Sequence, residues 1–228
     1  MMLIVRMYPQ YEVDKVWEYA EDRFSKYKKM DIVPLFMSQH DYQNFISVVC
    51  EANEPDMLAD FFGSEIAPCK EISCTRTVTL IKPAFFAVPK DVPENLCRFR
   101  VALRLDPKYY TKIYDKILTL KTPKNIFFAY VAYSFGEDDI LISLLAENKN
   151  IVRDFVSESI ENIEGVESVG VLLTHKTKRL ADDDVWRVHE RKYSVSRFVP
   201  GAKPAGEDDF DWTYLDHCSL HGALPDES

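Results

Sequence analysis

An internal repeat is the feature of this sequence that most constrains how the chain can fold. Three pairs of segments match in the same order along the chain: 5–11 with 103–109, 45–51 with 141–147, and 60–66 with 154–160. Their offsets are 98, 96 and 94 residues, and the small drift falls where loops are expected. Three ordered matches at nearly constant spacing indicate an ancient duplication, so the two halves should share one fold.

Each half has the same succession of strand-like and helix-like segments. The second half predicts strands at 97–105, 125–135, 140–147 and 165–177, and amphipathic helices at 109–120 and 151–163. The first half repeats this β-α-β-β-α-β order, which is the ferredoxin-like pattern. The sequence therefore predicts an α+β protein in which two tandem ferredoxin-like units face each other as a pseudo-two-fold dimeric α/β barrel.

Prolines and charged residues that interrupt the periodicity suggest the boundaries of these units. We predict a first unit at 1–82, a linker at 83–96, a second unit at 97–180 and an acidic C-terminal extension at 181–228. The end of the extension is rich in Gly, Pro and acidic residues, which is typical of segments that are disordered or docked on a neighbour. Its aromatic residues favour docking.

The bulk composition argues against several classes of protein. The chain of 228 residues is 46% apolar, enough for a sizeable core, and no apolar run approaches the roughly 18 residues of a membrane-spanning helix. Its start lacks a secretory signal, so we expect a cytoplasmic protein that does not bind membranes. The formal charge of −9 argues against direct binding of nucleic acid. Five scattered cysteines without a CxxC pair argue against a disulfide scaffold or a thiolate zinc site.

The acidic turn "GEDD" lies between two predicted strands and allows two interpretations. As a β-hairpin turn, it uses Gly and Asp for the backbone conformations that tight turns need, and we favour this interpretation. As a ligand site, Gly136, Glu137, Asp138 and Asp139 would hold the amine or the carboxylate of a small molecule. The counterpart of this turn in the first half contains His40, which should face the same region.

Two arginines and a segment near the C-terminus complete the candidate site residues. Arg6 and Arg104 recur on the matched first strands and could clamp a carboxylate ligand, although an outward-facing or ion-paired arginine is the favoured alternative. His217, Cys218 and His221 have ligand-like spacing but no fourth ligand, so they are weak metal candidates and no metal is predicted. The sequence has no nucleotide, dinucleotide, metalloprotease or serine-hydrolase motif, and no cofactor is predicted.

The second half resembles the effector-binding (RAM) domain of the Lrp/AsnC family of transcriptional regulators. The resemblance covers 97–180 and depends on two motifs, G-x-x-D before an apolar strand and a helix stop of the form I-x-G-V. In that family, two such domains pair through their sheets, and small effectors, often amino acids, bind between protomers near the G-x-x-D turn. The resemblance therefore implies a ligand site at Gly136 and Asp139, with Glu137 and Asp138 as neighbours.

The chain departs from this family in two ways. The first predicted strand begins at about residue 3, which leaves no room for the family's N-terminal helix-turn-helix. The first half also has His40 and Gln43 where the second half has Gly136 and Asp139. The resemblance then implies an asymmetric pocket in which the second half supplies the carboxylates.

These observations lead to one main functional hypothesis and two alternatives. The main hypothesis is a small-molecule effector-binding regulatory protein, similar to Lrp/AsnC sensor domains, with an enzyme the less favoured class. Such a protein would bind a small metabolite, such as an amino acid, and would act on transcription through a protein partner or as a homo-oligomer, using sheet edges and the C-terminal tail. The alternatives are an α/β-barrel enzyme that uses the cavity between the two sheets, and a structural pseudo-dimer that assembles into larger complexes.

Overall fold

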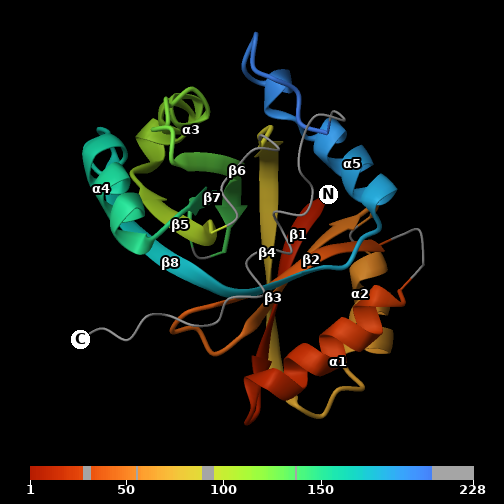
Figure 1. Ribbon diagram of the computed structural model, residues 1–228. Helices are drawn as coiled ribbons and strands as arrows, with labels where there is room; N and C mark the ends of the chain where they lie inside the picture. Colours follow the sequence, from red (N-terminus) through yellow and green to blue (C-terminus); the bar gives the residue numbers. More distant parts are fainter. Residues whose placement is uncertain (28–31, 55, 89–94, 137, 207–228) are drawn as a thin grey trace.

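Two ferredoxin-like units form one continuous barrel in the computed structural model (Figure 1). The structure describes residues 1–27, 32–54, 56–88, 95–136 and 138–206. The first unit contains β1 (Met2–Pro9), α1 (Val13–Ser25), β2 (Ile32–His40), β3 (Ile46–Ala52), α2 (Met57–Phe61), the π-helical turn η1 (Phe62–Ile66) and β4 (Ile72–Phe85). The second contains β5 (Cys97–Leu105), the 3-10 turn η2 (Pro107–Tyr109), α3 (Tyr110–Leu118), β6 (Ile126–Phe135), β7 (Ile140–Ala146), α4 (Lys149–Ser159) and β8 (Val166–Arg179). A further helix, α5 (Asp183–Lys192), and the turn η3 (Val195–Arg197) follow.

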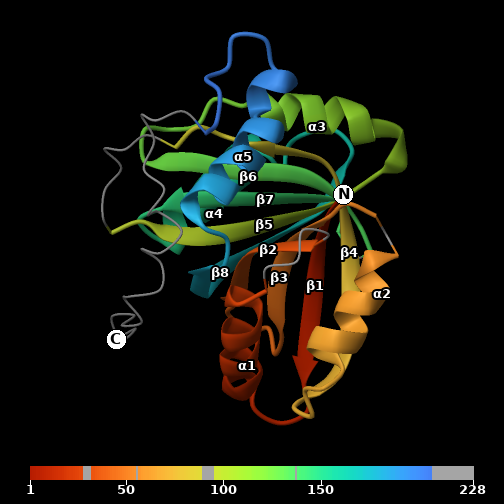
Figure 2. The ribbon, with the colours of Figure 1, turned by 90° about the vertical axis from the view of Figure 1, so that its right-hand side faces the viewer.

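The described strands close into a barrel in the order β1-β3-β2-β8-β5-β7-β6-β4, with antiparallel neighbours throughout. The long strands β4 and β8 allow this closure, because the first part of each pairs inside its own unit and the last part pairs with the other unit. Figure 2 shows the strands of the two units running in crossed directions. The predicted fold, a pseudo-two-fold barrel of two ferredoxin-like units, is confirmed.

The helices cover the outside of the barrel with their apolar faces. α1 buries Val16, Trp17, Ala20 and Phe24, which recur at helical spacing, against the first unit. α3 and α4 cover the second unit in the same way (Figure 1). β3 and β7 are buried along their whole length, because helices cover one face of each strand and the barrel interior covers the other.

The ends of α4 show how local sequence sets the path of the chain. The side chain of Asn148 accepts hydrogen bonds from the backbone N–H groups of Asn150 and Ile151 at 3.0 and 3.1 Å, which caps the start of the helix. Beyond the end of α4, Gly165 has a φ of 92°, and a Cβ atom there would lie 2.5 Å from Cγ of Tyr109. The predicted glycine stop is therefore required by both the backbone conformation and the neighbouring ring.

The C-terminal extension supplies α5, which lies across one end of the barrel (Figure 1). Trp186 on α5 is 1% exposed and makes edge-to-face contacts with Phe36 and Phe85, at centroid distances of 5.8 and 5.7 Å. These aromatic rings belong to the apolar cluster that fills the barrel interior. The described part of the extension therefore packs on the chain's own barrel.

A buried carboxylate fixes the C-terminal end of α5 to the first unit. Glu51 on β3 is contacted by Lys192 and His189, and the hydroxyl of Tyr193 donates to it at 2.6 Å. Burial opposes the ionisation of Glu51, but hydrogen bonds from His189, Lys192 and Tyr193 outweigh it and lower the pKa of Glu51 to about 2. Glu51 is therefore a charged anchor for the extension.

Two further expectations concern the chain as a whole. The division into units at 82 and 97 stays a prediction; β4 extends to Phe85 and β5 begins at Cys97. Within the part of the chain that the structure describes, no helix has the length and apolar character needed to cross a membrane.

Candidate functional site

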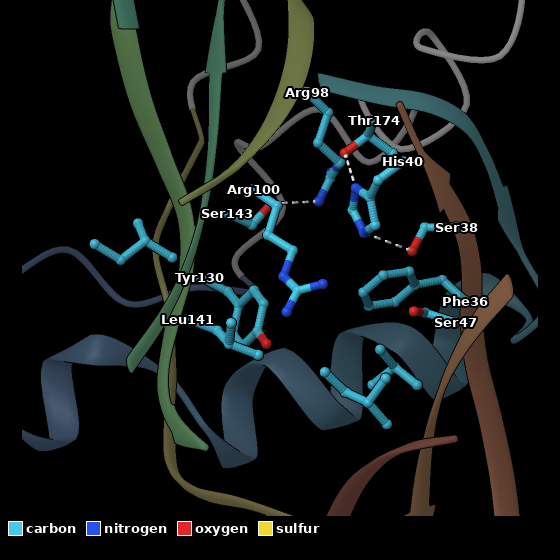
Figure 3. Close-up of a pocket in the computed structure, with 13 residues that line it drawn as sticks. Phe36, Ser38, His40, Ser47, Arg98, Arg100, Tyr130, Leu141, Ser143 and Thr174 are labelled. Atoms are coloured by element: carbon cyan, nitrogen blue, oxygen red, sulfur yellow. Dashed lines mark hydrogen bonds between the residues drawn. The ribbon is translucent and has the colours of Figure 1, made fainter. Parts of the chain in front are cut away.

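A cavity inside the barrel brings together buried polar side chains from both units (Figure 3). It offers about 40 Å³ to the centres of water-sized molecules, which is room for roughly three waters or one small ligand. Its polar lining consists of Ser38, His40, Ser47, Arg98, Arg100, Ser143 and Thr174, and its apolar lining includes Ile4, Phe36, Val49, Tyr130 and Leu141. The cavity lies inside the closed barrel and is lined by strands of both units.

The second unit provides a positively charged wall. Alternation along β5 points its apolar residues toward the helices and Arg98 and Arg100 into the barrel. Arg98 Nη1 donates to Ser143 Oγ at 2.9 Å, and Arg100 Nη2 donates to Asp138 Oδ2 at 2.8 Å. Both guanidinium groups are buried, where positive charge interacts with an anion more strongly than it does in water.

The first unit provides hydroxyl groups and an imidazole. His40, at the end of β2, has Thr174 Oγ1 at 3.1 Å from its Nδ1 and Ser38 Oγ at 3.5 Å from its Nε2. Ser47 on β3 is 4% exposed, and its Oγ has no hydrogen-bond partner among the described residues. Figure 3 shows these side chains on the wall opposite Arg100 and Tyr130.

Burial, more than the positive wall, sets the ionisation of His40 and Tyr130. The pKa of His40 is lowered well below its ordinary value, mainly by burial. The positive charges of Arg100, Arg6 and Arg98 act in the same direction. Burial also raises the pKa of Tyr130 to about 12, although the same three arginines act in the opposite direction. At neutral pH the cavity therefore contains a neutral imidazole and a neutral phenol beside cationic guanidinium groups.

Strand register shows which residues of the two units are equivalent. Ser47 lies opposite Arg6 in the β1–β3 pair, and Ser143 lies opposite Arg100 in the β5–β7 pair. The repeat of the sequence, at an offset of 98, had instead matched Arg6 with Arg104. Two residues before each opposing arginine, the first unit has Ile4 and the second has Arg98, the residue that donates to Ser143.

The structure separates the two predicted arginines. Arg6 is 1% exposed, and its Cζ lies 5.1 Å from the centroid of the Phe45 ring. Arg104 lies opposite Ser168 and is exposed. Of these two arginines, only Arg6 is buried, and its charge helps to lower the pKa of His40, which lines the cavity. The predicted ligand-binding role of Arg6, Arg104 and His40 stays a prediction.

The acidic turn uses its side chains within the protein. Asp139 accepts hydrogen bonds from the backbone N–H of Leu105 at 2.8 Å and from the hydroxyl of Tyr110, and Asp138 pairs with Arg100. Gly136 has a φ of 146°, a conformation that favours glycine. These contacts agree with the hairpin interpretation that the sequence favoured, while a ligand role for the turn stays a prediction.

Some candidates fall outside the described part of the chain. Glu137, His217, Cys218 and His221 are among them, as is the aromatic cluster of the tail. Within the described ranges, no group of three or more His, Cys, Asp or Glu side chains could hold a metal ion.

Sequence reasoning missed Arg98, Arg100 and Ser47. The signal for the arginines was present, since two charges alternate with apolar residues in "CRFRVALRL" and must share one face of the strand. Ser47 had no such signal, because a single serine in an apolar strand is ordinary.

The barrel and its interior cavity define a ferredoxin-like dimeric α+β barrel protein. Among the solved structures that align with most of the chain are a proposed monooxygenase from Lactobacillus acidophilus NCFM, 10% identical, and an anthrone oxidase-like protein, 7% identical. Each has a TM-score of 0.51 and covers 79% of this chain and 93% of its own. At these identities, the similarity shows the fold alone. No family model and no curated protein matches the sequence.

The comparison with the Lrp/AsnC family is narrower. AsnC from E. coli is 16% identical and aligns with 35% of this chain and 50% of its own, with a TM-score of 0.28. What the structure confirms of the predicted resemblance is the ferredoxin-like barrel fold. The RAM-domain assignment and a role in transcription are not confirmed.

These neighbours correct the main functional hypothesis. The monooxygenase and anthrone oxidase-like structures, each of which aligns with 79% of the chain, are named as enzymes or enzyme-like. The effector-binding regulator and the preference against an enzyme are therefore wrong. The alternative, a barrel enzyme that uses the cavity between the two sheets, agrees better with the comparison.

Proposed function

We propose that this protein is an enzyme that removes a proton from a small anionic carbon acid bound in the interior cavity. The observation that carries the proposal is the placement of neutral His40 opposite Arg98 and Arg100 in one small cavity. A neutral imidazole can accept a proton, because the anionic substrate offsets the arginine charges that help to lower the pKa of His40 in the free protein. The buried guanidinium groups stabilise the negative charge that forms. The enzyme names of the two structural neighbours support this class over a binding module.

We assign a role to each ring nitrogen of His40. With its proton on Nδ1 and donated to Thr174 Oγ1, His40 has the lone pair of Nε2 as the proton acceptor, and the substrate displaces the long contact of Nε2 with Ser38 Oγ at 3.5 Å. The C–H bond of the substrate breaks, the proton moves to Nε2, and the electron pair stays on the substrate as an enolate. Arg98 and Arg100 bind the anionic group and stabilise the enolate, which lowers the barrier to proton removal.

The test is exchange of substrate protons with solvent deuterium. Pyruvate and acetoacetate serve as probes in D₂O, with loss of their C–H signals followed by proton NMR. We expect the protein to accelerate exchange of at least one probe, and His40→Asn to lower that rate by about 100-fold or more. The control, His175→Asn, removes a histidine whose side chain is 56% exposed and should not change the rate.

Binding is measured separately, so that loss of catalysis is not confused with loss of the site. His40→Asn should keep the rise in melting temperature that the probe gives to the wild type, because the arginines remain. If no probe exchanges faster with protein than without it, the proposed activity is wrong.

Other expectations remain proposals alongside this one. The kinship of the second unit with Lrp/AsnC effector domains concerns ancestry and rests on the G-x-x-D motif at Gly136 and Asp139. A cytoplasmic location rests on composition. Assembly with a protein partner or as a homo-oligomer, through sheet edges or the C-terminal tail, would be tested by native mass spectrometry of the purified protein.

A further inference from the structure

The hydroxyl of Ser47 is a buried polar group that the proposed proton transfer does not use. It lines the cavity, is 4% exposed and has no hydrogen-bond partner among the described residues. A buried hydroxyl without a partner is destabilising, and most such groups in folded proteins are satisfied by the protein, by water or by a ligand. Ser47 therefore marks a place where a bound molecule would supply the missing hydrogen bond.

The equivalent serine in the other unit shows why Ser47 lacks a partner. Ser143 accepts a hydrogen bond at 2.9 Å from Arg98, which stands two residues before Arg100 on β5. The first unit has Ile4 at the corresponding place on β1. An isoleucine side chain cannot donate, so the duplicated serine keeps its place in the barrel and loses its partner.

The position of Ser47 relative to the arginines limits the shape of a ligand. In Figure 3 the Ser47 hydroxyl and the Arg100 guanidinium project into the cavity from opposite walls. A molecule that satisfies both needs an anionic group at one end and a second oxygen within a few bonds of it. The cavity has room for roughly three waters, which corresponds to a ligand of about five or six non-hydrogen atoms.

We infer that the substrate class is the short 2-oxo acids, with Ser47 as the residue that selects the 2-oxo group. The carboxylate binds at Arg98 and Arg100, and the Ser47 hydroxyl donates to the 2-oxo oxygen. This inference rests on the proposed function for the choice of a carbonyl over a hydroxyl group, because proton removal needs a carbon next to a carbonyl. Ser47 is a binding residue in this scheme and takes no proton.

The test compares ligands with the same three-carbon chain in matched variants by isothermal titration calorimetry. Pyruvate and propionate differ in that a carbonyl replaces a methylene group. We expect the wild type to bind pyruvate about five- to tenfold more tightly than propionate. Ser47→Ala should reduce this preference to about twofold or less without changing the affinity for propionate. In the absence of ligand, Ser47→Ala should have the melting temperature of the wild type or a higher one, since it removes an unsatisfied hydroxyl.

The matched control is Ser143→Ala, at the equivalent position of the second unit. Ser143 positions Arg98, which binds the carboxylate in this scheme. Ser143→Ala should therefore weaken the binding of pyruvate and the binding of propionate by the same factor. Lactate, with a hydroxyl in place of the carbonyl, should bind less tightly than pyruvate. Equal binding of pyruvate and propionate by the wild type, a preference that survives in Ser47→Ala, or tighter binding of lactate would each overturn the inference.

The two proposals fail in distinguishable ways. Selective binding of pyruvate through Ser47 without deuterium exchange would leave the ligand class standing and remove the proposed activity. Deuterium exchange that requires His40 but does not change in Ser47→Ala would support the proposed activity and remove the role of Ser47 in substrate selection.

Discussion

Ser47 on β3 and Ser143 on β7 occupy equivalent places in the two units, each opposite an arginine on the first strand of its unit. In the second unit the neighbouring Arg98 donates to the serine, and in the first unit Ile4 leaves it without a partner among the described residues. The second unit thus forms a wall of positive charge, while the first provides His40 and the Ser47 hydroxyl, which no described residue hydrogen-bonds. Divergence of two copies of one fold has placed complementary groups on facing walls of one cavity.

The same comparison extends to the ends of these strands. Glu51 follows Ser47 by four residues and is buried beneath α5, whereas its repeat counterpart Glu147 is exposed. The C-terminal extension covers the first unit at this point and not the second. Of these two matched glutamates, Glu51 anchors α5 because the C-terminal extension contacts it, and Glu147 lies exposed.

The largest expected effect comes from breaking the Glu51 anchor. Glu51→Gln should lower the free energy of unfolding by about 3 kcal/mol, because it removes one partner of a buried charged cluster. Glu147→Gln, at the exposed counterpart, should change it by less than about 0.5 kcal/mol. Urea denaturation at pH 7 measures both variants, and equal effects would mean that α5 is not anchored through Glu51.

The pH dependence of the same variant provides a second check. The pKa of Glu51 is lowered from 4.5 to about 2 in the folded protein, so its contribution to stability is present above about pH 4.5 and is lost as the pH falls toward 2. Glu51→Gln should therefore lose less stability than the wild type over that interval.

A smaller effect is expected at the two hairpin turns. Asp139→Ala removes the acceptor for the Leu105 N–H and the Tyr110 hydroxyl and should lower the free energy of unfolding by about 2 kcal/mol. Gln43→Ala, at its counterpart in the repeat, should cost about 0.5 kcal/mol or less. If the two variants are equally stable, the acidic turn does not depend on Asp139.

Arg98→Met places an apolar side chain where the first unit has Ile4 and should weaken the binding of anions in the cavity. Acetate should stabilise the wild type by binding at the positive wall, and the variant should bind acetate about tenfold less tightly, because a charged hydrogen-bond donor is lost. Arg104→Met, on the same strand but exposed, should change acetate affinity by less than about twofold. Titration calorimetry with sodium acetate distinguishes the two, and an unchanged affinity in Arg98→Met would contradict the anion site.

The smallest expected effect concerns the histidine that stands only in the first unit. The pKa of His40 is lowered in the folded protein, so below about pH 6.5 the unfolded chain binds a proton that the folded protein does not. The stability of the fold therefore decreases as the pH decreases. His40→Gln should reduce this loss by about 1 kcal/mol between pH 6.5 and 5.5. His175→Gln is the control for the loss of a histidine whose side chain is 56% exposed in the wild type. Identical slopes in the wild type and His40→Gln would show that folding does not lower the pKa of His40.

The duplication and the alternation of apolar residues were sufficient to predict the barrel. The two copies of β-α-β-β-α-β specify one set of strand neighbours within each unit. The mostly apolar sequences of β3 and β7 agree with their burial on both faces. Sequence pattern did not predict α5, because the periodicity lapses after residue 180 and its anchor, Glu51, lies more than 130 residues away along the chain.

The sequence by itself determined the fold class, the order of the elements and the two turns, since each depends on residues close together in the chain. The tertiary structure alone decided the candidate site. Strand pairing replaced the match of Arg6 with Arg104 by an equivalence of Arg6 with Arg100, because hydrogen bonds between strands set register independently of the best sequence offset. Barrel closure then brought His40 and Ser47 to face Arg98, and with them the burial and charge that set the ionisation of the cavity.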